Sequence, residues 1–244
     1  MLNIPSVETY IFGMQFKTNL IKGKLLKRYK RFLADVILED GTEVIAHCPN
    51  PGSMMGLATG GTTVWLEPNN DPKKKLKYGW RLVEHKNQMI CIDTSIANIV
   101  IKEALEKKEI PELSYWSFKP EVKYSDNSRI DFLLTSPSQQ TYLEIKSVTL
   151  MREKGLAEFP DTITKRGSKH LEDLSKMVTS GHKAVLLFLC MRKDVNRVRI
   201  AADLDIIYNA NIKAALKSGV ELICYDTQVT RFGVRLGKPI LVEI

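Results

Sequence analysis

The sequence predicts a mixed α/β protein in which an N-terminal β-barrel, residues 1–92, precedes an α/β domain, residues 93–244. Residues 15–92 consist of short strand patterns separated by turn signals, without helical periodicity. After residue 95, helical patterns alternate with strand patterns, which is typical of an α/β sheet with mixed strand directions. At 244 residues, the chain is long enough for one large domain or two smaller ones.

The composition fits a globular chain without a membrane anchor. The apolar fraction of 44% supports a hydrophobic core. No window holds the roughly 18 uncharged apolar residues that a membrane helix needs, and residues 1–8 lack the basic and apolar regions of a secretory signal. We therefore expect a cytoplasmic protein with no membrane partner. Scattered cysteines without a C-x-x-C motif argue against a zinc site or a disulfide framework: Cys48, Cys91, Cys190 and Cys224.

A basic segment near the N-terminus predicts a polyanionic partner. The net charge is +8 and the pI about 9.2, and no acid occurs between Thr9 and Ala34. A second lysine-rich run spans 73–77. Basic clusters on a small domain suit phosphate contacts, so we expect DNA, bound mainly through its phosphate backbone. The candidate nucleic-acid-binding residues of the first segment are Lys22, Lys24, Lys27, Arg28, Lys30 and Arg31.

The strands of the N-terminal half are expected over 20–26, 31–38, 43–47, 63–66, 81–84 and 89–92, with a hairpin turn at 39–41. A barrel of this size with basic strands resembles an OB-fold, a common platform for nucleic acids. Aromatic residues are interleaved with the charges. Most are expected to fill the barrel and some could stack on bases: Phe16, Tyr29, Phe32, Trp65 and Trp80.

The segment 48–54, C-P-N-P-G-S-M, predicts a rigid loop because two prolines flank Asn50 and Gly52 follows. The loop could contribute to a functional site or to a domain contact. Alternatively it is structural, with Ser53 capping a short helix over 54–58. No catalytic partner can be named for Asn50 or Ser53, which favours the structural interpretation.

Two carboxylates and a lysine in the second half form the candidate site. Asp131 lies in one apolar run, and Glu144 and Lys146 lie two apart in the next. Residues two apart in a strand share a face, and the short connection 136–138 allows a hairpin that would bring Asp131 alongside Glu144. Carboxylates of this kind can share Mg²⁺ or Mn²⁺, and the lysine can stabilise developing negative charge. The alternative is an exposed strand pair with Asp131 at a turn.

The remaining elements predict a sheet flanked by helices. Helices are expected over 95–108, from a cap at 161 or 162 to about 179, and over 203–217. Strands are expected over 121–124, 184–191, 198–201 and 220–225, with a charged loop after 150 and a closing hairpin over 233–244. Gly167 inside a helix predicts close approach of another backbone or a ligand. The second helix could aim Arg166, Lys169 and His170 at the site, for phosphate binding or charge stabilisation, or present them as a solvated basic face.

The spacing D-x(12)-E-x-K resembles the signature of the PD-(D/E)xK nuclease superfamily. The whole chain is similar to the sugar fermentation stimulation protein (SfsA) family, through C-P-N-P-G-S-M at 48–54, S-R-I-D-F-L-L at 128–134, Y-L-E-I-K-S-V-T-L at 142–150, F-P-D at 159–161 and R-G-x-K-H-L at 166–171. The resemblance implies non-specific DNA binding and a role in sugar metabolism, and the core suggests nuclease activity. It also implies a further metal-facing acid on the helix before the first core strand, for which Glu103 is the candidate and Glu121 the second choice.

Two functions follow as hypotheses. The first is a metal-dependent phosphodiesterase acting on DNA, with Asp131, Glu144 and Lys146 as catalytic residues and Asp131, Glu144 and Glu103 as metal ligands. The second is a non-catalytic, regulatory DNA-binding protein that retains the nuclease-like scaffold. A metabolite enzyme lacks support, because the sequence has no phosphate-cradling glycine loop or cofactor motif. No helix-turn-helix is apparent, so base readout in the major groove is not expected.

Overall fold

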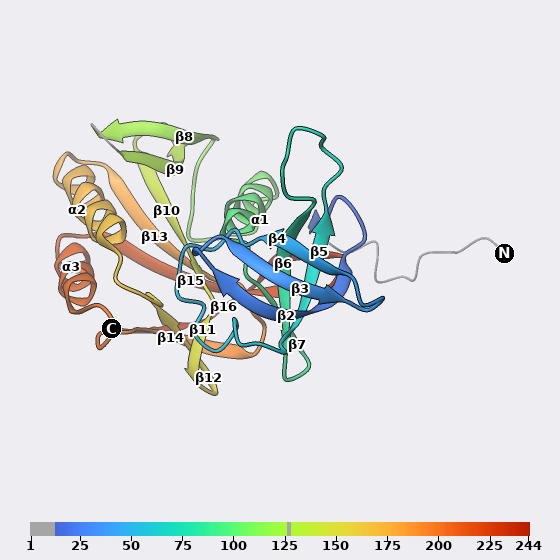
Figure 1. Ribbon diagram of the computed structural model, residues 1–244. Coiled ribbons are helices and arrows are strands. Elements are labelled where there is room, and N and C mark those ends of the chain that lie inside the picture. Colours follow the sequence, from blue (N-terminus) through green and yellow to red (C-terminus); the bar gives the residue numbers. More distant parts are fainter. Residues whose placement is uncertain (1–12, 126–127) are drawn as a thin grey trace. The chain divides into compact units, whose positions relative to one another are not determined.

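The computed structural model describes residues 13–125 and 128–244, and the chain divides into two compact units (Figure 1). The first unit contains the chain up to Glu106 together with Met191–Asp194 and Asp226–Gly237. The second contains Lys107–Cys190, Val195–Tyr225 and Lys238–Ile244. Residues 1–8, for which the sequence predicts no secretory signal, lie outside the described residues. No helix in the described ranges is long and apolar enough to cross a membrane.

The first unit contains the predicted β-barrel. Its strands pair in the order β4-β3-β2-β5-β6, a parallel pairing between β4 and β6 closes the ring, and β7 pairs with β6. The other neighbours in the ring are antiparallel. The strands are β2 Ile21–Tyr29, β3 Leu33–Leu38, β4 Glu43–His47, β5 Thr63–Pro68, β6 Tyr78–His85 and β7 Gln88–Cys91.

Alternation along the strands separates the barrel core from a charged outer face. On β2, Gly23 is buried and Lys24 is exposed, because successive side chains of a strand point to opposite faces. A Cβ at Gly23 would lie 2.6 Å from Val36 Cγ1 and 2.8 Å from the Ile37 carbonyl oxygen, so only glycine fits there. The predicted turn at 39–41 is confirmed, with Gly41 at a φ of 85°.

Turns replace the short helix predicted over 54–58. Met54 has a φ of 54°, a left-handed conformation that cannot begin an α-helix. The Ser53 hydroxyl accepts a hydrogen bond from the Met55 backbone N–H at 3.3 Å, which closes a local turn instead of capping a helix.

The helix α1, Thr94–Glu106, follows the barrel and confirms the helix predicted over 95–108. The Asp93 carboxylate accepts hydrogen bonds from the Ser95 backbone N–H at 3.0 Å and from the Ser95 hydroxyl at 2.6 Å. Arg81 pairs with Asp93 and, at 2.9 Å, with Glu67. The buried Asp93 therefore joins the start of α1 to the barrel strand β6.

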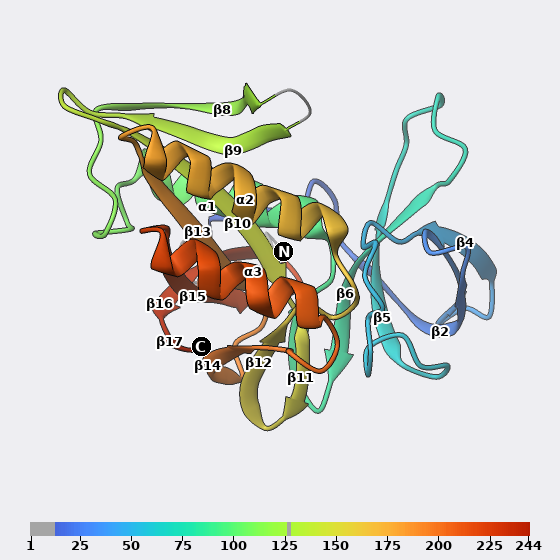
Figure 2. The same cartoon turned by 90° about the vertical axis from the view of Figure 1, so that its left-hand side faces the viewer.

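The second unit confirms the predicted α/β arrangement with mixed strand directions. Its larger sheet has the order β15-β13-β10-β9-β8, in which β10 is parallel to β13 and antiparallel to β9. The helices α2 and α3 lie side by side across this unit (Figure 2). The elements are β8 Ser117–Ser125, β9 Ser128–Thr135, β10 Gln140–Val148, α2 Lys165–Thr179, β13 Lys183–Cys190, α3 Ile206–Lys217 and β15 Glu221–Val229.

A second sheet occupies the region where the sequence predicted a charged loop and a closing hairpin. The strands β11 Leu150–Glu153, β12 Gly155–Phe159, β14 Val195–Ile200 and β17 Leu241–Glu243 pair in that order. The sequence pattern did not predict these strands because they contain charged residues, whose partners lie on neighbouring strands. Arg152, for example, pairs with the buried Glu158 at 2.7 Å. β16, Gly233–Pro239, does not pair with β17, so the predicted hairpin over 233–244 is wrong.

Two polar residues fix the first turns of α2 and α3. Thr164, rather than Asp161 or Thr162, caps α2, and its hydroxyl accepts from the Gly167 N–H at 3.0 Å. Asp205 caps α3 and also accepts from the Thr164 N–H at 2.8 Å. A Cβ at Gly167 would lie 2.8 Å from Thr164 atoms and 3.1 Å from the Tyr208 ring. The close approach at this glycine is therefore made by side chains rather than by another backbone segment.

Candidate functional site

The candidate site lies on the hairpin formed by β9 and β10. Leu143 pairs with Phe132, which places Asp131 and Glu144 at the next opposed position. Opposed residues of antiparallel strands project to the same face. The Asp131 carboxylate also accepts a hydrogen bond from the Ile145 backbone N–H at 2.7 Å, which holds it against β10. The predicted hairpin is confirmed, and its register, continued by one position, puts Asp131 opposite Glu144.

Glu144 is the buried acid of the site. The residue is only 2% exposed because β10 lies between β9 and β13. One carboxylate oxygen, Oε1, accepts a hydrogen bond from Lys146 Nζ at 2.6 Å and contacts His170 Nδ1. The other oxygen, Oε2, is buried and has no hydrogen-bond partner among the described residues. A buried carboxylate oxygen without a partner is costly unless a ligand satisfies it.

His170 connects Glu144 to the surface of α2. Lys146 Nζ lies 3.3 Å from His170 Nδ1, and Arg166 Nε donates to His170 Nε2 at 3.3 Å. Because Nε2 accepts from Arg166, the fitting neutral tautomer carries its proton on Nδ1 and donates it to Glu144. The predicted shared face of Arg166 and His170 is confirmed, and the two residues act together on one carboxylate oxygen.

The charges around Glu144 keep its carboxyl ionised. Burial by itself would raise the pKa of Glu144, but the positive Lys146 and the hydrogen bonds from His170 and Lys146 outweigh it and lower the pKa below its usual 4.5. The site therefore presents a charged carboxylate at neutral pH, as metal binding requires.

Sequence reasoning missed two tyrosines near this carboxylate. The hydroxyls of Tyr124 on β8 and Tyr208 on α3 are buried and have no hydrogen-bond partner among the described residues. Burial, followed by the charge of Glu144, raises the pKa of both, and Asp173 and Asp131 add to the effect on Tyr124. Both hydroxyls remain neutral donors. No sequence spacing connects them to the E-x-K motif, because the fold alone brings β8 and α3 to it.

The donor set fits a hard divalent cation. Asp131 and Glu144 supply carboxylate oxygens, and Mg²⁺ is commonly held by one or two carboxylates with water and substrate phosphate completing its shell. Within the described ranges, no group of three or more His, Cys, Asp or Glu side chains is arranged to hold a metal. Asp131 and Glu144 are therefore the residues of the second unit that could hold such a cation.

Glu103 and Glu121 are the two further acids considered from the sequence. Glu103 is on α1 in the first unit, where a side chain at Gly13 would clash with its carboxylate. Glu121 is exposed on β8, and its carbonyl oxygen accepts from Arg129 at 3.1 Å. The second unit by itself brings together Asp131, Glu144, Lys146 and His170, and a metal-binding role for Glu103 stays a prediction.

Lys169 belongs to a second polar cluster beside the site. Its ammonium group donates to Asp173 at 2.6 Å and to Ser128 at 2.9 Å, and Ser128 donates to Asp173 at 2.7 Å. Asp173 is 2% exposed. Burial would raise its pKa, but Lys169, Ser128, Lys176 and Ser125 lower it to about 2. Lys169 therefore neutralises a buried carboxylate, although much of the lysine side chain remains accessible to solvent.

The basic residues of the barrel divide into two groups. Arg28 is occupied, because its guanidinium donates to the carbonyl oxygens of Asn50 at 2.8 Å, Gly52 at 2.9 Å and Ser53 at 3.2 Å. This supports the structural interpretation of the loop 48–54. The other group lies on the outer face of β2 or in the turn after it: Lys22, Lys24, Lys27, Lys30 and Arg31. Within this group, Lys24 donates a hydrogen bond to Thr63 and Lys27 pairs with Asp35.

Two family profiles match the chain. The profile "Sugar fermentation stimulation protein RE domain" matches residues 95–233, and "SfsA N-terminal OB domain" matches residues 26–92. A "Sugar fermentation stimulation protein homolog" from Ruegeria pomeroyi is 54% identical over 226 residues, covering 91% of this chain and 98% of the relative. A homolog of the same name from Roseobacter denitrificans is 50% identical over 235 residues, covering 95% and 100%.

One solved structure shares the fold. "The structure of Pyrococcus Furiosus SfsA in complex with Ca2+" superposes with a TM-score of 0.85 at 24% identity, and covers 95% of this chain and 98% of that chain. The likeness shows a common architecture, with the barrel followed by the α/β unit.

Replacing Asp173 with asparagine should destabilise the protein in a pH-dependent way. Because the folded-state pKa is lowered from 3.8 to about 2, the ionised carboxylate contributes about 2 kcal/mol above pH 4 and loses this contribution as the pH falls towards 2. In urea unfolding, the free energy of unfolding should be lower for Asp173→Asn than for the parent at pH 7, and this difference should shrink below pH 4. Glu172→Gln, at the neighbouring exposed position, should have the parent's free energy of unfolding. A loss of stability in Asp173→Asn that stays constant with pH would contradict the ion-pair account.

Replacing Arg28 with lysine separates its structural role from its charge. Lysine keeps the positive charge but cannot reach three carbonyl oxygens, so the free energy of unfolding should fall by about 1–3 kcal/mol. Affinity for duplex DNA, measured by fluorescence anisotropy, should stay within about twofold of the parent. Lys27→Ala is the matched comparison and should show the reverse pattern. An Arg28→Lys protein of unchanged stability would show that the carbonyl contacts do not support the loop.

Proposed function

The chain belongs to the sugar fermentation stimulation protein family, and on this premise we propose that it binds DNA non-specifically and hydrolyses phosphodiester bonds with a divalent metal ion. DNA binds to the basic outer face of the barrel strands, and Asp131, Glu144 and Lys146 carry out the chemistry.

The proposal rests on a difference between the two oxygens of the Glu144 carboxylate. Oε1 is held by Lys146 and contacts His170, while the buried Oε2 has no hydrogen-bond partner among the described residues. A purely structural ion pair would be expected to satisfy both oxygens. A cation at Oε2, shared with Asp131, accounts for the unused oxygen.

Mg²⁺ or Mn²⁺ fits this donor set, since both prefer oxygen ligands. The SfsA protein of Pyrococcus furiosus was solved in complex with Ca²⁺, which is another oxygen-preferring cation. When bound, such a metal polarises a phosphoryl oxygen and lowers the pKa of a water molecule.

The chain's own residues orient the charge around that position. Lys146 is mostly buried, so its ammonium group keeps much of its electrostatic strength and can face a phosphate that approaches the carboxylates. His170 and Arg166 hold the Glu144 carboxylate in one orientation from the α2 side. Arg166 is exposed, so the same guanidinium can also contact a phosphate next to the site.

The barrel supplies the affinity for the DNA backbone. Lys22 and Lys24 lie on the same outer face of β2, opposite Trp65 and Thr63 of β5. Together with Lys27, Lys30 and Arg31 they present positive charge to phosphates without a group suited to reading paired bases. This arrangement favours binding that does not depend on sequence.

Purified parent protein should cleave DNA in Mg²⁺ or Mn²⁺ and not in EDTA. Asp131→Asn and Lys146→Ala should each lower the cleavage rate by at least about 100-fold, because each removes charge from the reacting phosphate or its metal. Plasmid nicking and cleavage of labelled single-stranded and branched DNA measure the rates.

Asp40→Asn, which removes an exposed acid from a barrel turn, is the matched control and should cleave as the parent does. If no DNA form is cut by the parent in either metal while binding persists, the chain is a DNA-binding protein on a nuclease-like scaffold, and the catalytic part of the proposal is wrong.

Affinity for duplex DNA should fall steeply between about 50 and 200 mM salt, because phosphate contacts release counterions. The double change Lys22→Ala with Lys24→Ala should reduce the slope of log affinity against log salt by roughly 2. Lys183→Ala, which removes a lysine paired with Glu221 in the second unit, should leave the slope unchanged. An affinity that does not respond to salt would contradict binding through the backbone.

A further inference from the structure

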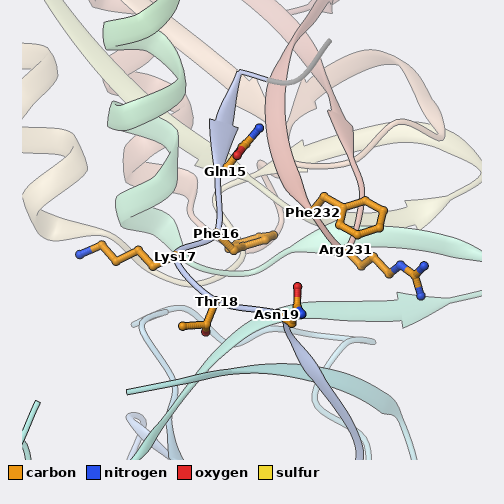
Figure 3. Close-up of a pocket in the computed structure, with 7 residues that line it drawn as sticks. All are labelled: Gln15, Phe16, Lys17, Thr18, Asn19, Arg231 and Phe232. Atoms are coloured by element: carbon orange, nitrogen blue, oxygen red, sulfur yellow. The ribbon is translucent and has the colours of Figure 1, made fainter. Parts of the chain in front are cut away.

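An aromatic groove on the first unit has no role in the function proposed above. A cavity of about 410 Å³ is lined by residues that include Phe16, Lys17, Asn19, Arg231 and Phe232 (Figure 3). A neighbouring cavity of about 300 Å³ shares Asn19, Arg231 and Phe232 and adds Trp65. Both volumes fall in the range of about 300–1,000 Å³ that is typical of ligand sites. The shared residues join the two cavities into one groove.

Backbone pairing holds the two phenylalanines of the groove in place. The strand β1, Met14–Gln15, pairs antiparallel with β16, with Gln15 opposite Gly233. The Phe16 N–H donates to the Phe232 carbonyl oxygen at 3.0 Å. A Cβ at Gly233 would clash with the Met14 carbonyl oxygen, so glycine permits this approach. The rings are thus presented from adjacent, paired segments of backbone.

The groove combines stacking surfaces with positive charge and an amide. Phe16, Phe232 and Asn19 all line the same cavity (Figure 3). The Arg231 guanidinium lies 4.8 Å from the Phe232 ring centroid, and Lys17 is exposed. Nucleobases stack on aromatic rings, amides hydrogen-bond to base edges, and cations bind the phosphates between bases.

The groove continues into the basic face of the barrel. Trp65 is half-buried, and its indole N–H is held by Glu84 at 3.3 Å. Lys22 lies opposite Trp65 in the sheet, with its ammonium group 5.9 Å from the ring centroid. A strand of DNA whose phosphates contact Lys22 and Lys24 therefore passes the aromatic groove in the same unit.

We propose that this groove binds unpaired bases, so that the preferred DNA contains single-stranded segments. Bases inside a duplex are stacked on one another, and only a base outside that stack can cover a ring in a recess. The inference rests on the proposed DNA binding and adds the form of DNA that the protein prefers.

Fluorescence anisotropy with a labelled deoxythymidine strand of about 15 nucleotides, and with a blunt duplex of the same length, tests the groove. Phe232→Ala should weaken binding of the single strand by roughly fivefold or more, because a stacked base contributes about 1–3 kcal/mol, and should change duplex binding by less than about twofold. Trp116→Ala removes an exposed ring of the second unit that does not line the groove, and should leave both affinities unchanged.

Phe232→Trp keeps a stacking surface and guards against loss of folding in the alanine variant. It should retain the parent's affinity, and the single strand should quench its added fluorescence while the duplex should not. Equal effects of Phe232→Ala on both DNA forms, or no effect on either, would overturn the groove inference and leave DNA binding intact. A parent protein that binds neither DNA form would overturn the proposed function as well.

Discussion

The buried Glu144 carboxylate is the constraint on which the second unit depends. A charge that is 2% exposed is costly unless neighbouring groups compensate it. Lys146 compensates it from the same strand, and His170 does so from α2, which Thr164 and Asp205 fix at its first turn. These contacts converge on Oε1 and leave the buried Oε2 without a hydrogen-bond partner among the described residues. The hairpin, the sheet and α2 are all needed to produce that asymmetry.

Much of the fold could be predicted from the sequence because most elements follow local periodicity. The barrel alternation on β2, the turn ending at Gly41 and the buried run of β13 each have a pattern that one strand explains by itself. The predictions failed where charges are satisfied across strands. Arg152 and Glu158 form an ion pair between β11 and β12, but in the sequence their charges predicted a loop. Likewise, the positive φ of Met54 cannot be read from its side chain.

The core of the candidate site was predictable for a geometric reason. A spacing of two residues in a strand fixes Glu144 and Lys146 on one face, and a short hairpin fixes Asp131 opposite. The remaining members come from elements distant in the sequence. Tyr124 and Tyr208 come within the electrostatic influence of the carboxylate only through the packing of β8 and α3. For Arg28 and Lys169 the sequence predicted DNA contacts from charge alone. It could not show that carbonyl oxygens already bind Arg28 and that the buried Asp173 already binds Lys169.

The most direct measurement of the central claim is a calorimetric titration with Mn²⁺ in the absence of DNA. We expect the parent and the exposed control Glu153→Gln to bind Mn²⁺ with equal affinity, and Glu144→Gln to lose at least about tenfold in affinity. Asp131→Asn, at a less buried position, should show the same loss and guards against misfolding of the first variant. Equal Mn²⁺ affinity in all four proteins would contradict the account, because the unpartnered Oε2 would then not be a metal ligand.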